Sequence, residues 1–326
     1  MQSALSEYQD LAPSKSVLME ISVTGRGRQL LQWADENRNH IDELLNQHGA
    51  LVLPGLKLNT CAQFERLLTR LWGQELLEYR NRSTPRTCLK GRIYSSTEYP
   101  PEESIPLHNE NAYSHAWAMR LALACLIPAQ QGGTTPLADS RKVYQRIPPA
   151  IRQRFEDQGV LYVRHYGVLD LSWQEVFQTD QREVVSTYCR EHDIDFQWHD
   201  DGSLTTRERR PASACHPRTG ERVWFNQAHL FHLSNYRPEI QQSLLNSVGP
   251  ERLPRNSYYG DGSPIAAADL AVIRKAYDEE TIRRPWRMGD VVLLDNMLYA
   301  HGRDPFSGPR KVLVGMACPY QQAQAH

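Results

Sequence analysis

The sequence lacks the features that mark membrane-spanning, secreted and nucleic-acid-binding chains. No stretch approaches 18 uninterrupted apolar residues, so no membrane-spanning helix is predicted. The first ten residues, Met1–Asp10, do not show the basic-then-apolar order of a secretory signal. The chain also lacks an excess of positive or negative charge, because 37 basic residues balance 38 acidic residues. We therefore expect a soluble cytoplasmic protein with no nucleic-acid or membrane partner.

Cysteine motifs are missing too. The six cysteines, at positions 61, 88, 125, 189, 215 and 318, never stand three positions apart, which excludes zinc-ribbon and thioredoxin spacings. Without a secretory signal, reduced and mostly buried thiols are expected. Cys189 with His192, and His229 with His232, are spaced like ligands on one helical turn. No second pair completes a zinc site at Cys189, and no acid or cysteine stands near His229, so neither pair is assigned to a metal.

The pattern of apolar residues predicts helices packed on the outside of a β core. A chain of 326 residues with 40% apolar content can bury a large core in a single domain, with or without a lid. Helices are predicted over residues 27–47, 60–71, 140–158, 173–192 (as one or two helices), 238–247 and 265–281. Strands are predicted over residues 16–23, 50–53, 119–127 and 159–165, near 196, 204 and 224, and around His301 and Arg310.

The first chemical signal is the pair His108 and Glu110. Residues two apart on an extended strand face the same side, so one imidazole and one carboxylate could bind one metal ion. The triplet alone is weak evidence, because chance predicts about one His-x-Asp/Glu in this composition and the chain contains three. The other two begin at His40, inside a predicted helix, and at His199, in a predicted turn. Only His108 follows proline-rich sequence and precedes a strong strand.

A third ligand is expected from His301, which follows the apolar run of residues 290–300. Two histidines and one carboxylate on one face, with the other positions open, suit a non-heme Fe(II) centre that must admit a cosubstrate and dioxygen. The alternative is a buried polar cluster held by hydrogen bonds. Arg310 and Lys311 open the strand that follows. Adjacent residues face opposite ways, and a guanidinium pairs with a carboxylate better than a point charge does, so Arg310 is preferred as an anion ligand.

These motifs resemble the taurine dioxygenase (TauD/TfdA) family of Fe(II)/2-oxoglutarate oxygenases. The resemblance spans nearly the whole chain beyond Leu53. It is nearest to a subgroup from nonribosomal peptide pathways, the syringomycin-type aspartyl hydroxylases. The segments that carry it are Glu98–Pro101, Pro106–Glu110, Gly132–Pro136, Trp224–His232 and Tyr258–Gly262.

The resemblance implies a fold, a ligand set and cosubstrates. The fold would be α+β, with a double-stranded β-helix (jelly roll, cupin-like) core, surrounding helices and a lid inserted at about residues 140–220, all in a single domain over residues 1–326. His108, Glu110 and His301 would bind Fe(II). The far carboxylate of 2-oxoglutarate would bind Thr135 and Arg310, with Arg303 as a less favoured substitute for Arg310. Dioxygen would be the oxidant.

The resemblance further implies hydroxylation of an unactivated C–H bond in an amino acid, either free or tethered to a peptidyl carrier protein, with release of succinate and CO2. Halogenating relatives have a small residue at the position of Glu110, which argues against halogenation here. Epoxidation or desaturation of a similar substrate by the same ligands stays open. A non-catalytic cupin-like binding protein is the alternative from another class.

Ahead of the metal motif, the segment between Glu78 and Glu98 contains no acid and five cations, at positions 80, 82, 86, 90 and 92. A solvated loop explains most of them. We expect one, Arg86, to bind a carboxylate of the substrate or of an acidic carrier domain.

Overall fold

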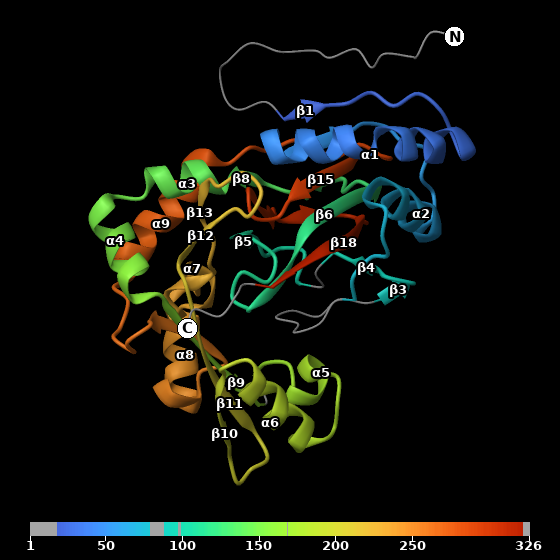
Figure 1. The fold of residues 1–326 in the computed structure, drawn as a ribbon. Coiled ribbons are helices and arrows are strands. Elements are labelled where there is room, and N and C mark those ends of the chain that lie inside the picture. Colours follow the sequence, from blue (N-terminus) through green and yellow to red (C-terminus); the bar gives the residue numbers. More distant parts are fainter. Residues whose placement is uncertain (1–17, 79–87, 97–98, 168, 322–326) are drawn as a thin grey trace.

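The computed structural model describes residues 18–78, 88–96, 99–167 and 169–321, and its architecture is mixed α+β, with sheets at the centre (Figure 1). The largest sheet has seven strands in the order β1-β2-β15-β6-β18-β4-β3. These strands are Met19–Glu20 (β1), Ala50–Leu53 (β2), Cys88–Lys90 (β3), Ile93–Ser95 (β4), Ala116–Ile127 (β6), Val291–Asp295 (β15) and Lys311–Gln321 (β18). The two longest, β6 and β18, pair antiparallel along almost their whole lengths.

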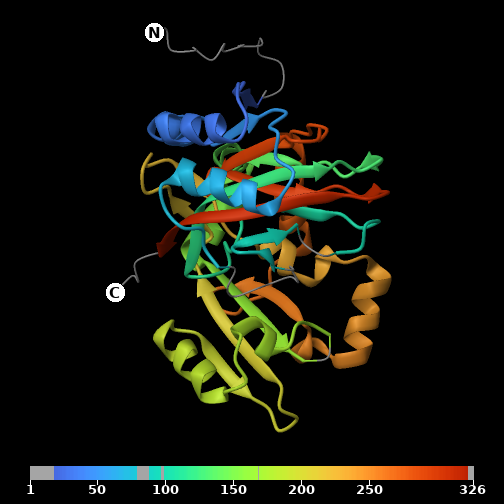
Figure 2. The same ribbon diagram turned by 90° about the vertical axis from the view of Figure 1, so that its right-hand side faces the viewer.

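Two helices cover one face of this sheet (Figures 1 and 2). They are Arg28–His48 (α1) and Cys61–Trp72 (α2). Because side chains alternate along a strand, Ala122 and Ala124 of β6 pack with these helices, while Leu121 and Leu123 pack into a second apolar cluster on the opposite face. The face that the helices leave uncovered is therefore apolar as well.

A three-stranded sheet lies against that second face. Its strands are Ile105–His108 (β5), Tyr299–Arg303 (β16) and Leu137–Asp139 (β8), in the order β5-β16-β8. Leu137 and Tyr299 belong to the same apolar cluster as Leu121 and Leu123, so the two sheets enclose it. Ala138 and Ala300 point the other way, toward helices that include Ser140–Arg146 (α3), Pro149–Gln158 (α4), Ala228–Phe231 (α7) and Ala267–Glu280 (α9).

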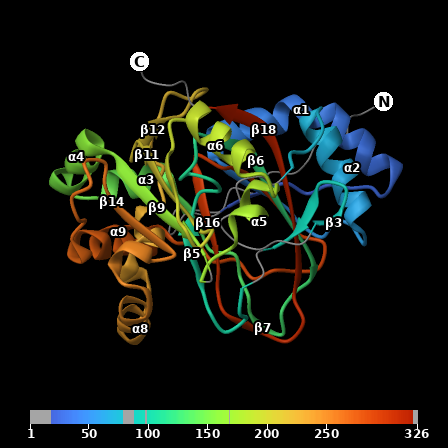
Figure 3. The same ribbon diagram turned by 90° about the horizontal axis from the view of Figure 1, so that it is seen from below.

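A third sheet forms a lobe at one end of the molecule, at the bottom of Figure 1 and facing the viewer in Figure 3. Its strand order is β10-β11-β9-β14. The strands are Val160–Tyr166 (β9), Asp195–Trp198 (β10), Leu204–Arg210 (β11) and Arg255–Tyr259 (β14), and the helices Trp173–Phe177 (α5) and Arg182–Glu191 (α6) pack on them. The remaining elements are Gln131–Gly132 (β7), Ser213–Cys215 (β12), Arg222–Trp224 (β13), Phe306–Ser307 (β17), Pro238–Val248 (α8) and the 3-10 helices Leu233–Asn235 and Pro250–Arg252.

Most predicted elements are present, with two differences. The helix predicted over 140–158 is two helices, because Pro149 restricts the residue before it and is tolerated only in the first turn of α4. The strand predicted over 16–23 is limited to Met19–Glu20 among the described residues. No helix in the described part of the chain is both long and apolar enough to cross a membrane.

All six cysteines are free thiols. The prediction that most of them are buried was wrong. Only Cys125 and Cys189 are buried, whereas Cys88 and Cys215 are exposed.

Candidate metal centre

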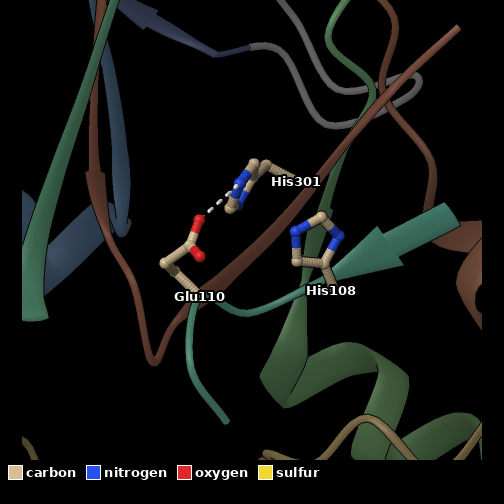
Figure 4. Close-up of side chains that lie close together, drawn as sticks. All are labelled: His108, Glu110 and His301. Carbon is tan, nitrogen blue, oxygen red and sulfur yellow. Dashed lines mark ion pairs between the residues drawn. The ribbon is translucent and has the colours of Figure 1, made fainter. Parts of the chain in front are cut away.

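His108, Glu110 and His301 lie together beside the space between the two facing sheets (Figure 4). Each offers one ligand atom, and these atoms lie within 4.8 Å of one another. Nε2 of His301 is 3.7 Å from Oε2 of Glu110. Ligand atoms bound to one ion at about 2.1 Å lie roughly 3–4 Å apart, so a small contraction would bring all three onto a common metal. No other group of three such side chains in the described ranges has this geometry.

The two histidines come from neighbouring strands. His108 ends β5 and stands directly opposite His301 on β16, so the backbone ladder fixes their separation. Nδ1 of His108 lies 2.8 Å from the carbonyl oxygen of Pro106. A proton on Nδ1 that is donated to this carbonyl leaves the lone pair on Nε2, which is the arrangement that a metal ligand needs.

Glu110 reaches the site from a turn, and not from an extended strand as the sequence analysis assumed. The side chain of Asn296 holds this turn. Its Oδ1 accepts a hydrogen bond of 2.7 Å from the backbone N–H of Glu110, and its Nδ2 donates to the carbonyl of Glu110 at 2.9 Å. Asn111, the next residue, has a φ of 56°, a left-handed conformation that asparagine tolerates. The turn brings the Glu110 carboxylate to the two imidazoles.

A second buried amide supports the same turn. Nδ2 of Asn109 donates to Oγ of Ser140 at 3.0 Å and to the carbonyl of Asn296 at 2.6 Å. Nε2 of Gln227 donates to the carbonyl of Asn109 at 2.7 Å. Sequence reasoning missed these three amides, although each stands in a motif that carried the family resemblance. The available signals were the position of Asn296 directly after a buried strand and that of Asn109 directly after His108.

A pocket opens beside His108 and His301, between the sheets. Its apolar wall comes from the large sheet, and Thr135 and Arg310 supply polar groups. Arg310 donates to the carbonyl of Gly133 at 3.0 Å, to Oγ of Ser96 at 3.2 Å and to Oγ1 of Thr135 at 3.5 Å. All three acceptors are neutral. Burial, together with the nearby charge of Arg303, lowers the pKa of Arg310 to about 10, so it is a cation at neutral pH and suited to bind an anion.

The competing cations are placed differently. Arg303 lines the same pocket, but its guanidinium donates to the carbonyls of Tyr99, Pro100 and Glu103 at 2.6–2.9 Å. Lys311 is exposed. The geometry therefore favours Arg310 as the anion ligand. Arg86, the predicted substrate residue, lies outside the described residues.

The two other candidate pairs have partners within the protein. Nε2 of His229 lies 2.9 Å from the carbonyl oxygen of Leu107, and burial lowers the pKa of His229 to about 3. Nδ1 of His232 lies 2.8 Å from Oγ of Ser234. The ring of His192 stacks on that of His115, with centroids 3.8 Å apart. These contacts account for the histidines without a metal.

Comparison with known proteins decides the family. Residues 7–317 match the family model described as "Taurine catabolism dioxygenase TauD, TfdA family". The chain belongs to the TauD/TfdA family. It is therefore an Fe(II)/2-oxoglutarate-dependent oxygenase that uses O2, and its two histidines and one carboxylate suit Fe(II) with coordination positions left open.

The chain is also similar to individual proteins in sequence and in structure. The dapdiamide synthesis protein DdaC of Enterobacter agglomerans is 40% identical over 87% of each chain. A clavaminate synthase-like protein of Arabidopsis thaliana is 29% identical over 86% of this chain and 84% of its own. PvcB of Pseudomonas aeruginosa, at 14% identity, shares the fold with a TM-score of 0.57 over 97% of this chain and 92% of its own.

We predict that Asn296→Ala weakens metal binding. The substitution removes the amide that fixes the backbone of Glu110, and loss of such supporting contacts lowers metal affinity by about tenfold to a hundredfold. Anaerobic Fe(II) titration measures this. Asn226→Ala is the control, since Asn226 is also a buried asparagine whose hydrogen bonds within the described residues go to backbone groups, at Ala212 and Ala228. Equal metal affinity in the two variants would contradict the role of Asn296.

We predict a similar contrast between two glycines. A Cβ on Gly302 would lie 2.6 Å from the backbone oxygen of Ile105, so Gly302→Ala should push β5 away from β16 and separate His108 from His301. The atoms nearest to a Cβ on Gly315 would be the ends of flexible side chains, the Cδ1 atoms of Leu68 at 2.4 Å, Ile93 at 3.3 Å and Leu76 at 3.5 Å. Both variants should lose about 1–3 kcal/mol of stability. Only Gly302→Ala should also lose Fe(II) affinity, and intact affinity in a folded Gly302→Ala would refute this account of the strand pair.

Proposed function

We propose that this oxygenase hydroxylates an unactivated C–H bond of an amino acid or amino-acid-derived substrate during natural-product biosynthesis, with release of succinate and CO2. The observation that carries the proposal is the 40% identity, over 87% of the chain, to a protein named for dapdiamide synthesis. The substrate would be either free or presented by a peptidyl carrier protein.

His108, Glu110 and His301 would hold Fe(II) on one face. When bound, the iron supplies the oxidation of the C–H bond by O2, coupled to oxidative decarboxylation of 2-oxoglutarate. The protein's part is positional. The Pro106 carbonyl sets the tautomer of His108, and Asn296 sets the direction of Glu110. Retention of Glu110 supports hydroxylation over halogenation, because a carboxylate takes the position that halide would need.

Arg310 and Thr135 would hold the far carboxylate of 2-oxoglutarate. Nε1 of Trp286 donates to Oγ1 of Thr135 at 3.0 Å. Because the hydroxyl oxygen already accepts this bond, its own proton is available for a carboxylate. The guanidinium of Arg310 would add a charge-assisted hydrogen bond from the same side of the pocket.

We also propose that the two facing sheets correspond to the double-stranded β-helix (jelly roll) expected of the family, in a single domain over residues 1–326. The insertion at about residues 140–220 would contain the lid. The lobe of β9–β11, α5 and α6 supports this assignment because it stands at one end of the pair of facing sheets (Figure 1). A lid there would exclude water from the reaction and position the substrate.

The test is a screen for succinate. The protein is loaded anaerobically with Fe(II) and 2-oxoglutarate, the weak visible charge-transfer band of that complex is recorded, and free and carrier-bound amino acids are then tested with O2. We expect substrate-dependent succinate and a product that gains one oxygen atom. Loss of two hydrogens would indicate desaturation, and oxygen addition to an alkene substrate would indicate epoxidation. His301→Ala should abolish the band, and a band of unchanged strength would remove His301 from the ligand set.

Arg310→Ala should weaken the binding of 2-oxoglutarate and leave the binding of Fe(II) unchanged. Loss of a charge-assisted hydrogen bond costs about 1.5–3 kcal/mol, so the 2-oxoglutarate concentration for half-maximal rate should rise about tenfold to a hundredfold. Fe(II) affinity should stay at the wild-type level. Lys311→Ala is the control, because Lys311 is adjacent and exposed. An equal effect of both substitutions would show that Arg310 does not bind the carboxylate.

A further inference from the structure

Two cations beside the metal ligands share one aromatic ring. The guanidinium carbons of Arg303 and Arg310 lie over the ring of Phe306, 5.2 and 5.5 Å from its centroid. Both distances fall within the range of about 6 Å over which the face of an aromatic ring attracts a cation. Both arginines line the pocket beside His108 and His301, and Phe306 stands behind them, outside the lining. We therefore expect Phe306 to act on a ligand in the pocket through the arginines.

The short strand pair of β7 and β17 places the ring. Phe306 of β17 stands opposite Gly132 of β7. The backbone N–H of Gly133 donates to the carbonyl of Pro305 at 2.9 Å, which closes this strand pair. The carbonyl of Gly133 in turn accepts a bond of 3.0 Å from Nε of Arg310. The same backbone segment thus holds both the aromatic ring and one end of the guanidinium.

Gly133 is what lets the ring and the guanidinium stem come close. Its φ is 67°, a left-handed conformation that favours glycine. A Cβ at this position would lie 3.0 Å from Cβ of Phe306 and 3.1 Å from Cδ of Arg310. A side chain there would push the two apart. The contact between Phe306 and Arg310 is therefore built into the backbone.

The hydrogen bonds of Arg310 leave part of its guanidinium available for a ligand. A guanidinium has five N–H donors, and three of them bond to Gly133, Ser96 and Thr135. Within the described residues this leaves one N–H on Nη1 and one on Nη2. That pair of donors is the one a carboxylate accepts in a bidentate contact. Because the ring of Phe306 lies against the guanidinium, it limits the directions in which these two donors can point.

We propose that Phe306 is a positioning residue for the cosubstrate, because its ring holds the guanidinium of Arg310 in the orientation that binds the far carboxylate of 2-oxoglutarate. The inference rests on the proposed assignment of Arg310 to that carboxylate. Arg303, the other cation on the ring, is anchored by three backbone carbonyls. Loss of the ring would keep the charge of Arg310 and lower the fraction of molecules in which its donors are aligned.

Anaerobic titration of the full-length Fe(II)-loaded protein with 2-oxoglutarate tests this role. The charge-transfer band and calorimetry are readouts that need neither turnover nor an amino-acid substrate. Phe306→Leu should weaken 2-oxoglutarate binding by about threefold to tenfold and leave Fe(II) affinity unchanged. Phe306→Tyr keeps the ring and should bind like the wild type. Tyr99→Leu is the matched control, since among the described residues the ring of Tyr99 lies over Arg303 alone, at 5.9 Å, and it should bind 2-oxoglutarate like the wild type.

A double-mutant cycle distinguishes positioning of Arg310 from a general loosening of the pocket. In the Arg310→Ala background, Phe306→Leu should cause no further loss of 2-oxoglutarate affinity, because the group that the ring positions is already gone. Additive losses would overturn the role of Phe306. Wild-type affinity in folded Phe306→Leu, or an equal loss in Phe306→Tyr or Tyr99→Leu, would overturn it as well.

The remaining outcomes separate this inference from the proposed function. If Phe306→Leu does not fold, Phe306→Met replaces it in the same comparisons, since methionine is also apolar and has no ring. Wild-type 2-oxoglutarate affinity in Arg310→Ala would refute the assignment of Arg310 and this inference together. Failure of every amino acid to release succinate, with the effects at Phe306 as expected, would refute only the proposed hydroxylation.

Discussion

The site depends on one contact, the side-chain amide of Asn296 against the backbone of Glu110. The two histidines need no such help, because β5 and β16 are hydrogen-bonded neighbours and place His108 opposite His301. Glu110 has left the strand, so nothing in the ladder fixes it. Asn296 makes the pair of hydrogen bonds that a neighbouring strand would have made. It stands five residues before His301, so the two ligand-bearing segments are held to each other.

Asn296 is itself held by a buried polar network around Asp295. Oδ1 of Asp295 accepts from the backbone N–H groups of Met297 and Leu298 at 2.9 and 3.0 Å, which fixes the turn between β15 and β16. Its other oxygen pairs with Arg120 and with His216. A buried ion pair contributes little net stability but is costly to break. We infer that its value here is directional, since it keeps the turn in one conformation before any metal binds.

The sequence alone predicted most elements and the three side chains that the structure brings together, for identifiable reasons. His301 was found because it follows a long apolar run that could only be a buried strand. Glu110 was predicted on a wrong assumption about its geometry, since the two-residue spacing from His108 was taken to mean that both lie on one face of a strand. In the structure, a turn that includes Asn111 in a left-handed conformation places the Glu110 carboxylate beside the imidazoles. The supporting amides could not be predicted, because Asn296, Asn109 and Gln227 acquire their roles only through contacts distant in sequence.

The surroundings of Arg310 suit the cosubstrate carboxylate that is proposed to bind there. Arg310 has only neutral acceptors among the described residues, and burial depresses its pKa, so an anion there gains a full unit of buried counter-charge. A cosubstrate that every turnover requires suits such a site.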